Sequence, residues 1–265
     1  GIVLGTLLIA FVASVIAEVA RFGGFSVVRT GDQLVIRRGL LERREVSVAL
    51  DRIQAIRIVE GLLRQPLGYA AIIVETAGHA DERGQSTPLH PFLHKSRWQA
   101  LLRELAPGHD IEPELTRPPR RALSRFLLRP LLAALLGAAL LSISVPFGWL
   151  AFVLALAAPL LGWLGFRDAG VGVSGQTLLL TRRTLRRTTA IVRRRRIQFS
   201  ESSSSWFLRR RQLADLTVAV ASGTGGKLFS VPALDAEVVD RLLAWSGPSA
   251  PRLEPAGAGA LEQRS

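Results

Sequence analysis

The sequence contains no cysteine and no methionine. Without cysteine the chain has no disulfide framework, no thiolate zinc site and no cysteine nucleophile, which suits the reducing side of a membrane. Because even position 1 lacks methionine and Gly1 already begins an apolar run, we expect the chain to be the C-terminal part of a longer protein. Acidic residues are also scarce, since 21 Asp and Glu oppose 34 Lys and Arg and leave a net charge of +13. A chain that is both this basic and 48% hydrophobic is typical of a membrane protein with basic loops on one side.

Charged side chains are missing altogether from residues 131–166, which also lack His, Asn and Gln. One helix of that length would run about 54 Å, whereas the hydrocarbon core of a bilayer is roughly 30 Å thick. Two spans of about 18 residues each would fit if the chain reversed at 142–148, close to Pro146. We therefore predict a transmembrane helical hairpin over residues 126–166. The alternative is a buried pair of core helices in a soluble protein.

Residues 1–20 predict a further transmembrane helix, or the remainder of one. The charges Glu18 and Arg21 follow the apolar run, whereas in a signal peptide charge precedes it. Basic residues flank the hairpin on both sides and none lies in its turn, so the positive-inside rule places both flanks in the cytoplasm. We expect a multi-pass protein of the bacterial plasma membrane with both soluble domains cytoplasmic. Residues 108–125 are predicted as a linker, and the Pro-, Ala- and Gly-rich residues 248–265 as a disordered tail.

Two segments, 25–107 and 170–247, predict the same order of elements. Each begins with short β-branched runs separated by turns that contain Gly, which indicates an antiparallel sheet or barrel. Each ends in one amphipathic helix, and Asp235 is the expected N-cap of the second one.

An internal repeat connects these two segments. The run 31–36 matches 175–180, and at the same offset of 144 residues the triplet Arg-Ile-Gln at 52–54 recurs at 196–198. The sequence therefore predicts one fold used twice.

Three motifs in the first segment carry a family resemblance. They are Gly-Leu-Leu-Glu-Arg-Arg at 39–44, Val-Ala-Leu-Asp-Arg-Ile-Gln-Ala-Ile at 48–56 and Leu-Leu-Arg-Gln-Pro-Leu-Gly-Tyr at 62–69. They resemble bacterial membrane proteins with pleckstrin-homology (PH) domains of the YdbS/YdbT type. The resemblance implies transmembrane helices that alternate with PH-like, partly open antiparallel β-barrels of about seven strands, each closed by a C-terminal helix. In the second segment the pattern has drifted, because Gln-Leu at 212–213 stands where the first has Leu-Gly at 67–68.

We predict a non-enzymatic integral membrane protein whose function is to bind a ligand. On this hypothesis the cytoplasmic PH-like domains bind an anionic lipid surface or a protein partner, either another copy of the chain or a second PH-domain membrane protein. The family resemblance implies a link to envelope stress or to resistance against membrane-active compounds. The alternative is an oligomerising membrane scaffold in which the barrels make protein–protein contacts only.

A basic cluster within residues 177–211 supplies the candidate lipid-binding residues. Eleven arginines oppose the single Glu201, and each basic residue near an anionic membrane surface contributes about 1 kcal/mol of attraction. The alternative is a solvated β-hairpin that the arginines merely keep soluble. Two aromatic residues beside the last three arginines would insert at headgroup level, or would instead plug the end of the barrel. The candidate residues are Arg182, Arg183, Arg186, Arg187, Arg193, Arg194, Arg195, Arg196, Trp206, Phe207, Arg209, Arg210 and Arg211.

Signals of other functions are weak. His90 and His94 have the i, i+4 spacing of a metal site, but Pro91 interrupts them and no third ligand is evident. We therefore predict no catalytic residue, no metal site and no cofactor. Nucleic acid is not an expected partner, because no recognition motif accompanies the arginines.

Overall fold

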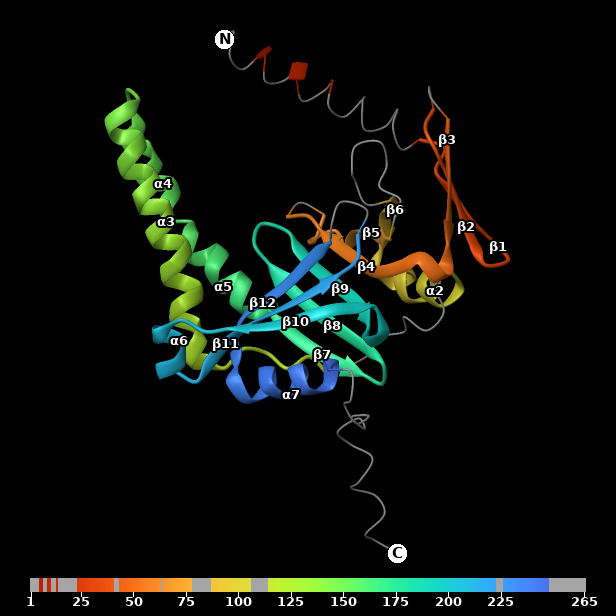
Figure 1. Cartoon of the computed structure of the whole chain (residues 1–265). Coiled ribbons are helices and arrows are strands. Elements are labelled where there is room, and N and C mark those ends of the chain that lie inside the picture. The colour runs from red at the N-terminus through yellow and green to blue at the C-terminus, as the bar shows by residue number, and fades with distance from the viewer. Residues whose placement is uncertain are drawn as a thin grey trace, which may run out of the picture.

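The structure is a computed structural model that describes residues 23–40, 43–62, 64–77, 87–105, 114–222 and 226–247, with a few positions before residue 14. It contains two β-rich units and a helical hairpin between them in the chain (Figure 1). We call residues 25–105 copy one and residues 170–247 copy two.

Both copies have the same order of strands and end in one α-helix, as the sequence predicted. Copy one comprises β1 (Ser26–Thr30), β2 (Gln33–Arg38), β3 (Arg44–Ala49), the 3-10 turn η1 (Leu50–Arg52), β4 (Ile53–Glu60), β5 (Tyr69–Thr76), β6 (Thr87–His94) and α2 (Lys95–Leu105). Copy two comprises β7 (Gly170–Ser174), β8 (Thr177–Arg183), β9 (Arg187–Arg193), η4 (Arg194–Arg196), β10 (Ile197–Ser203), the short helix α6 (Trp206–Arg210), β11 (Leu213–Val220), β12 (Lys227–Asp235) and α7 (Ala236–Ser246). The predicted N-cap is confirmed, because the Asp235 carboxylate accepts a hydrogen bond of 3.3 Å from the Glu237 amide.

The strands form three antiparallel sheets instead of two barrels. Two sheets have three strands each, in the orders β1-β2-β3 and β10-β11-β12, and the third has six in the order β6-β5-β4-β9-β8-β7. In the six-stranded sheet β4 pairs with β9, from Ala55 opposite Val192 to Glu60 opposite Arg187. The expectation of a barrel of about seven strands in each copy is therefore wrong. Each copy has six strands among its described residues, and one of its two sheets continues into the other copy.

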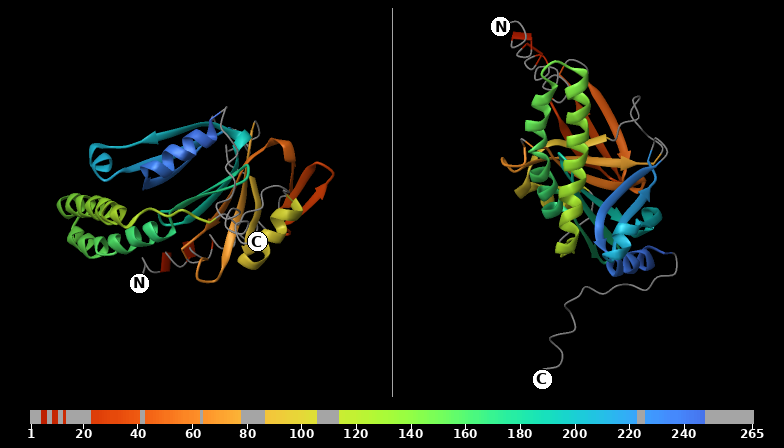
Figure 2. Two further views of the ribbon diagram at one scale, coloured as in Figure 1. Left: turned by 90° about the horizontal axis from the view of Figure 1, so that it is seen from below. Right: turned by 90° about the vertical axis from the view of Figure 1, so that its left-hand side faces the viewer.

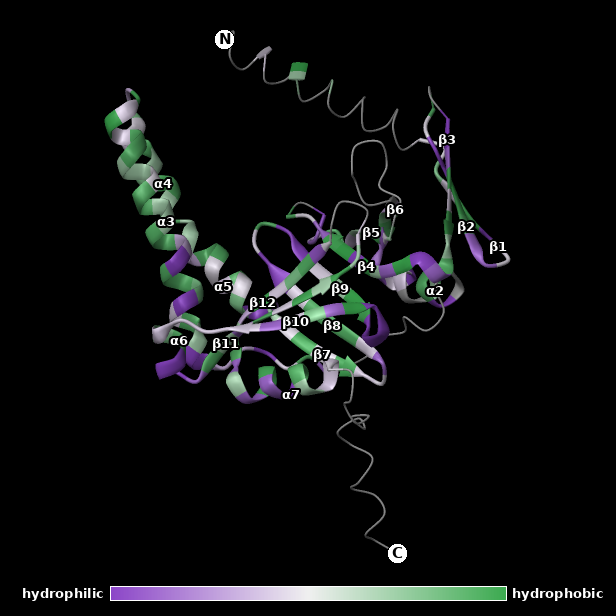
Figure 3. Cartoon of the chain, viewed as in Figure 1, coloured by the Kyte–Doolittle hydropathy of each residue, from purple (hydrophilic) through white to green (hydrophobic). Residues whose placement is uncertain are grey.

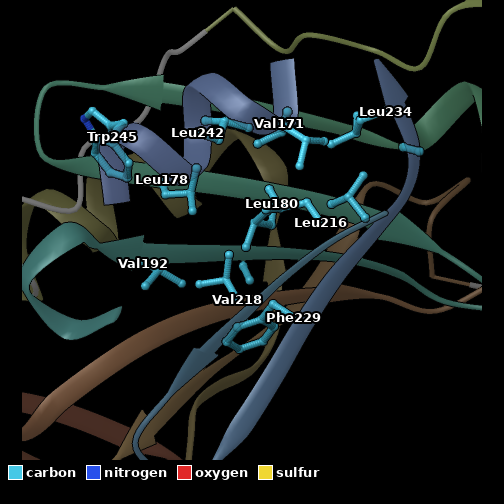
Figure 4. Packing of buried hydrophobic residues seen from close by; sticks show 14 of the residues in the cluster. Val171, Leu178, Leu180, Val192, Leu216, Val218, Phe229, Leu234, Leu242 and Trp245 are labelled. Atoms are coloured by element: carbon cyan, nitrogen blue, oxygen red, sulfur yellow. The ribbon is translucent and has the colours of Figure 1, made fainter. Parts of the chain in front are cut away.

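The six-stranded sheet has a hydrophobic core on each face. Side chains alternate between the faces of a strand, so Ile191 packs into the core of copy one while its neighbour Val192 packs into that of copy two. In copy two the core lies between the two sheets and is closed by Leu242 and Trp245 of α7 (Figure 4). Each copy thus depends on side chains of the shared sheet.

The hairpin consists of α3 (Leu123–Ser144), the tip η3 (Gly148–Leu150), α4 (Ala151–Ala155) and α5 (Ala158–Asp168). The 22 residues of α3 span about 33 Å, enough for a bilayer core. The hairpin projects from the β-rich part of the molecule, and its two arms lie side by side (Figures 1 and 2). The chain reverses at Phe147, where φ is 63°, within the predicted turn.

The apolar surface of the hairpin faces outward. Two helical stretches, 120–144 and 148–168, are long and apolar enough to cross a membrane, yet only 6% and 22% of their apolar windows are buried. Figure 3 shows hydrophobic residues along the hairpin and polar ones at its base. A pair of core helices in a soluble protein would be buried, so the burial favours the membrane hairpin over that alternative.

The flanking segments only partly match their predicted boundaries. The predicted linker 108–125 contains structure, because Thr116 and Val171 exchange backbone hydrogen bonds of 2.7 and 3.0 Å and α3 already begins at Leu123. Most of residues 1–20 and all of 248–265 lie outside the described residues. The first span and the disordered tail therefore stay predictions.

Candidate functional site

A cavity of about 430 Å³ lies where α3 and α5 of the hairpin meet the β8–β9 turn of copy two. Phe126, Pro130, Ala133 and Leu161 supply an apolar wall from the two helices, and Leu185 closes the cavity from the turn. Gly162 lets the helices approach closely, since a Cβ there would overlap the carbonyl oxygen of Phe126. The cavity is therefore at the end of the hairpin where the apolar span begins.

Four arginines line this cavity, and two of them are neutralised. Arg125 donates hydrogen bonds of 2.8 and 2.6 Å to the two carboxylate oxygens of Asp215. The buried Arg183 donates one of 2.7 Å to Asp168, the last residue of α5. These pairs attach each arm of the hairpin to a strand of copy two, and no acidic side chain is among the described residues that line the cavity.

The other two arginines, Arg129 and Arg182, have no carboxylate partner in the described part of the chain. Arg129 is exposed on α3, and Arg182 donates a hydrogen bond of 2.6 Å to the uncharged hydroxyl of Ser230. Arg186 is exposed in the adjoining turn. Two guanidinium groups beside an apolar wall can bind a phosphate diester whose hydrocarbon part lies against that wall.

The short helix α6 presents the two candidate aromatic residues to solvent. The exposed fractions of Trp206 and Phe207 are 61% and 42%, whereas that of the following Leu208 is 2%. Leu208 fills the adjacent core, so it closes the end of copy two and the aromatic residues do not. The guanidinium carbon of Arg210 lies 4.0 Å from the Trp206 ring centroid, and that of Arg211 lies 4.5 Å from the Phe207 ring centroid.

Helix α6 is attached next to the first turn of the hairpin. Arg211 donates hydrogen bonds to the hydroxyl of Ser124 and, at 3.1 Å, to the carbonyl of Arg121. Arg209, like Arg210, is exposed. Two further aromatic side chains and two exposed arginines thus lie near the base of the hairpin.

The remaining candidate arginines lie at the other end of β9 or at the contact between copies. Arg194 donates a hydrogen bond of 2.8 Å to the Gly247 carbonyl, and Arg196 donates one to a carbonyl of copy one. Burial, and then the charges of Arg195 and Arg196, lower the pKa of Arg193. Because β9 has seven residues, this group lies roughly 20 Å from the β8–β9 turn.

Arg187 is an inter-copy contact, because its Nη1 lies 3.5 Å from Oε2 of Glu60 on β4. The thirteen candidates therefore fall into three groups: the β8–β9 turn, η4 and α6. Only the turn and α6 lie near the hairpin. Residues that form one basic cluster in the sequence are thus distributed over three places in the structure.

Sequence reasoning missed Arg129 as a site residue, although its position carried a signal. In the sequence, Arg125 and Arg129 were noted only as the basic flank of the hairpin. Arg129, however, lies inside the predicted span and directly precedes Pro130 and the apolar part of the helix. A charge at that depth is expected to have a partner or a role. No group of three metal-binding side chains occurs among the residues described.

These features define a class: PH-like antiparallel sheets closed by a C-terminal helix and joined to exposed apolar helices. The chain belongs to the Bacterial PH domain family, whose model matches residues 1–108 and 128–250. It is similar to the UPF0699 transmembrane protein YdbT of Bacillus subtilis (strain 168), with 33% identity over 243 residues. That match covers 90% of this chain and 49% of YdbT, so the chain spans about half the length of this relative. The family resemblance is confirmed, and the chain is a membrane protein with PH domains.

Proposed function

We propose that this protein is a non-enzymatic, multi-pass protein of the bacterial plasma membrane that binds anionic phospholipid at the base of its hairpin. The observation that carries the proposal is the cavity in which Arg129 and Arg182, without a carboxylate partner among the described residues, lie together with apolar side chains of the two helices. A phospholipid matches both parts of the cavity, because its negatively charged phosphate suits the arginines and its hydrocarbon chain suits the apolar side chains. Basic pockets beside transmembrane helices on the cytoplasmic side suit such headgroups.

The charge distribution supports a cytoplasmic position for this cavity. Arg120, Arg121, Arg125 and Arg129 precede the apolar part of α3 and Arg167 follows that of α5, whereas the tip carries no charge. By the positive-inside rule, the base of the hairpin and both PH-like copies face the cytoplasm. The exposed Trp206 then lies near the headgroup level, where its amphipathic ring is favoured.

The test uses the full chain in bilayer nanodiscs of phosphatidylcholine with a minor fraction of phosphatidylglycerol. Native mass spectrometry after gentle release counts the lipids that remain bound. The double variant Arg129→Gln/Arg182→Gln loses about 2 kcal/mol of attraction at about 1 kcal/mol per basic residue, which weakens phosphatidylglycerol retention roughly 30-fold.

The matched control is Arg97→Gln/Arg195→Gln, which removes the same charge from exposed positions on α2 and η4. This control should retain phosphatidylglycerol as the unmodified chain does. Equal loss in both double variants, or equal retention of phosphatidylcholine and phosphatidylglycerol by the unmodified chain, would refute a built lipid site.

We further propose, from the family resemblance, that lipid binding serves the response to envelope stress or to membrane-active compounds. A strain that lacks the gene should then be more sensitive to such compounds, and the Arg129→Gln/Arg182→Gln variant should fail to restore resistance. Restoration by that variant would separate the biological role from the lipid site.

A further inference from the structure

The two copies are joined by one pairing of strand edges, and the equivalent edges elsewhere in the described part of the chain are open. The pairing joins β4, from the second sheet of copy one, to β9, from the first sheet of copy two. The offset of 144 residues that relates η1 to η4 makes β10 the equivalent of β4 and β3 the equivalent of β9. Both β3 and β10 lie at the edge of their sheets, with no strand beyond them among the described residues.

Burial differs between the paired strands and their open equivalents. Strand β4 is buried along most of its length, whereas β10 is mostly exposed and its Phe199 side chain is 52% exposed. Likewise β9 has three consecutive buried residues and no exposed one, whereas β3 has one buried residue and three exposed ones. The same position in the fold is thus covered where a second copy is present and uncovered where none is.

The two edges of the six-stranded sheet are protected in ways that β3 and β10 are not. At one edge of the six-stranded sheet, β6 contains Pro88 and Pro91, which cannot donate backbone hydrogen bonds. At its other edge, β7 is bridged by Thr116. Strands β3 and β10 contain neither Pro nor Lys, and no further strand pairs with their outer edges among the described residues. They carry the charges of Arg44, Glu45 and Glu201, and β10 has an irregularity between Ile197 and Phe199, but the equivalent β4 has the same irregularity at Ile53 and Ala55 and is still paired. The backbone groups on these outer edges can therefore accept another strand.

We infer that β10 of one chain pairs antiparallel with β3 of a second copy of the same chain. Transferring the β4–β9 register by 144 residues places Ser200 opposite Ser47 and Ser202 opposite Glu45. The hydroxyl of Ser200 is buried and has no hydrogen-bond partner among the described residues of its own chain. In this register the Ser47 hydroxyl, which donates a hydrogen bond of 2.7 Å to Oε1 of Gln33, becomes its cross-strand neighbour and can accept a hydrogen bond from Ser200.

This pairing is heterologous, because one surface of the chain binds a different surface of its neighbour. Each bound chain still offers a free β3 or a free β10, so the contact extends into a head-to-tail row or closes into a ring. The row would repeat between chains the contact that already joins the two copies within one chain. It is independent of the lipid site, since neither open edge contributes to the cavity.

Disulfide trapping tests the register directly, because the chain has no cysteine of its own. Two full chains with different tags are co-expressed in one membrane, one with Glu45→Cys and the other with Ser202→Cys, and are then oxidised. Directly opposed residues of antiparallel strands lie within about 4.5–5.5 Å between Cα atoms, which suits a disulfide. We expect a cross-linked product that carries both tags. This product should disappear when an excess of a cysteine-free chain is co-expressed and competes for the same strand edges.

The control replaces Glu45→Cys by Ser26→Cys, on the opposite edge of the same sheet. Ser26 and Glu45 lie on either side of Arg37 and both pair with it. The control thiol is therefore level with Glu45 across the sheet but about 10 Å farther from the proposed partner. It should give no mixed product with Ser202→Cys. A second pair, Arg44→Cys with Ser203→Cys, tests the same register if one variant folds poorly. Absence of product from both pairs, equal product from the control, or self-linked Ser202→Cys chains would overturn the inference.

Discussion

Arg125 of α3 and Asp215 of β11 form a two-point ion pair, with nitrogen–oxygen distances of 2.8 and 2.6 Å. The same carboxylate accepts a hydrogen bond of 2.8 Å from the amide of Ala233, where φ is 53°. One acidic side chain therefore ties the hairpin to two strands of copy two. We expect Asp215→Asn to lower the free energy of unfolding by about 2 kcal/mol, because it weakens hydrogen bonds to a charged, partly buried group.

Thermal unfolding of the chain in detergent micelles measures this loss. The control is Glu45→Gln, which removes the partner of Arg37 in a pair whose side chains are 63% and 55% exposed. An exposed pair of this kind contributes little to stability, because solvent screens the two charges. Equal losses in the two variants would contradict an anchoring role for Asp215.

The contact between the two arms of the hairpin should depend on one glycine. A Cβ at Gly162 would overlap the backbone carbonyl of Phe126, so Gly162→Ala must push α5 away from α3. We expect a loss of about 1–3 kcal/mol, as for overpacking in a core. Gly137→Ala is the matched control in the same hairpin, because no heavy atom lies within 4 Å of its added Cβ. Thermal unfolding in micelles should leave that control unchanged or slightly more stable.

The shared sheet predicts that a residue of copy two stabilises copy one. Ile191→Ala would leave a cavity in the core of copy one and cost about 2–5 kcal/mol. Hydrogen exchange should then speed up in β4 and β5 more than in β11 and β12. Val192→Ala, on the other face of the same strand, should show the opposite distribution. Faster exchange confined to copy two in both variants would contradict a shared core.

The hairpin and the closing helices were predictable because each follows from local sequence. A charge-free stretch of that length specifies two spans, and helical spacing of Leu101, Leu102 and Trp98 specifies α2. The shared sheet was not predicted, because a strand edge is satisfied equally well by its own copy or by another. A signal was present, however. Ala190-Ile191-Val192 and Ala55-Ile56 are apolar at consecutive positions, which indicates a strand buried on both faces.

The cavity was beyond sequence reasoning for a different reason. Arg129 and Arg182 are far apart in sequence, and nothing in the sequence shows that Arg125 and Arg183, unlike them, have carboxylate partners. The difference between the two pairs depends on where Asp215 and Asp168 lie in space. Net charge identified a basic region, but only tertiary structure shows which of its charges are already neutralised.

Helix α6 should respond differently to substitution at neighbouring positions. Leu208→Ala removes a buried side chain and should cost about 2–5 kcal/mol of stability in a thermal unfolding measurement. Trp206→Ala should change stability by no more than about 0.5 kcal/mol, because the ring is exposed. If Trp206 lies at the headgroup level, brominated lipids should quench the fluorescence of a variant that keeps it as the sole tryptophan. A large loss of stability in Trp206→Ala would contradict its exposed position.

Acidification should destabilise copy one through His90. Its ring packs against Phe25, with centroids 5.4 Å apart, and its Nδ1 accepts a hydrogen bond of 3.3 Å from the Phe92 amide. Burial lowers the pKa of His90 from its ordinary value of 6.5, so the unfolded chain binds this proton more readily than the folded one. The stability that His90 contributes is therefore complete above pH 6.5 and is lost as the pH falls toward the lowered pKa.

The linked change for one proton cannot exceed about 1.4 kcal/mol per pH unit. Unfolding temperatures between pH 7.5 and pH 5.5 should fall more in the unmodified chain than in His90→Gln, which cannot take up that proton. Hydrogen exchange should locate the difference in β5 and β6, next to the ring. An identical pH dependence of the two proteins would show that the pKa of His90 is the same in the folded and unfolded chains.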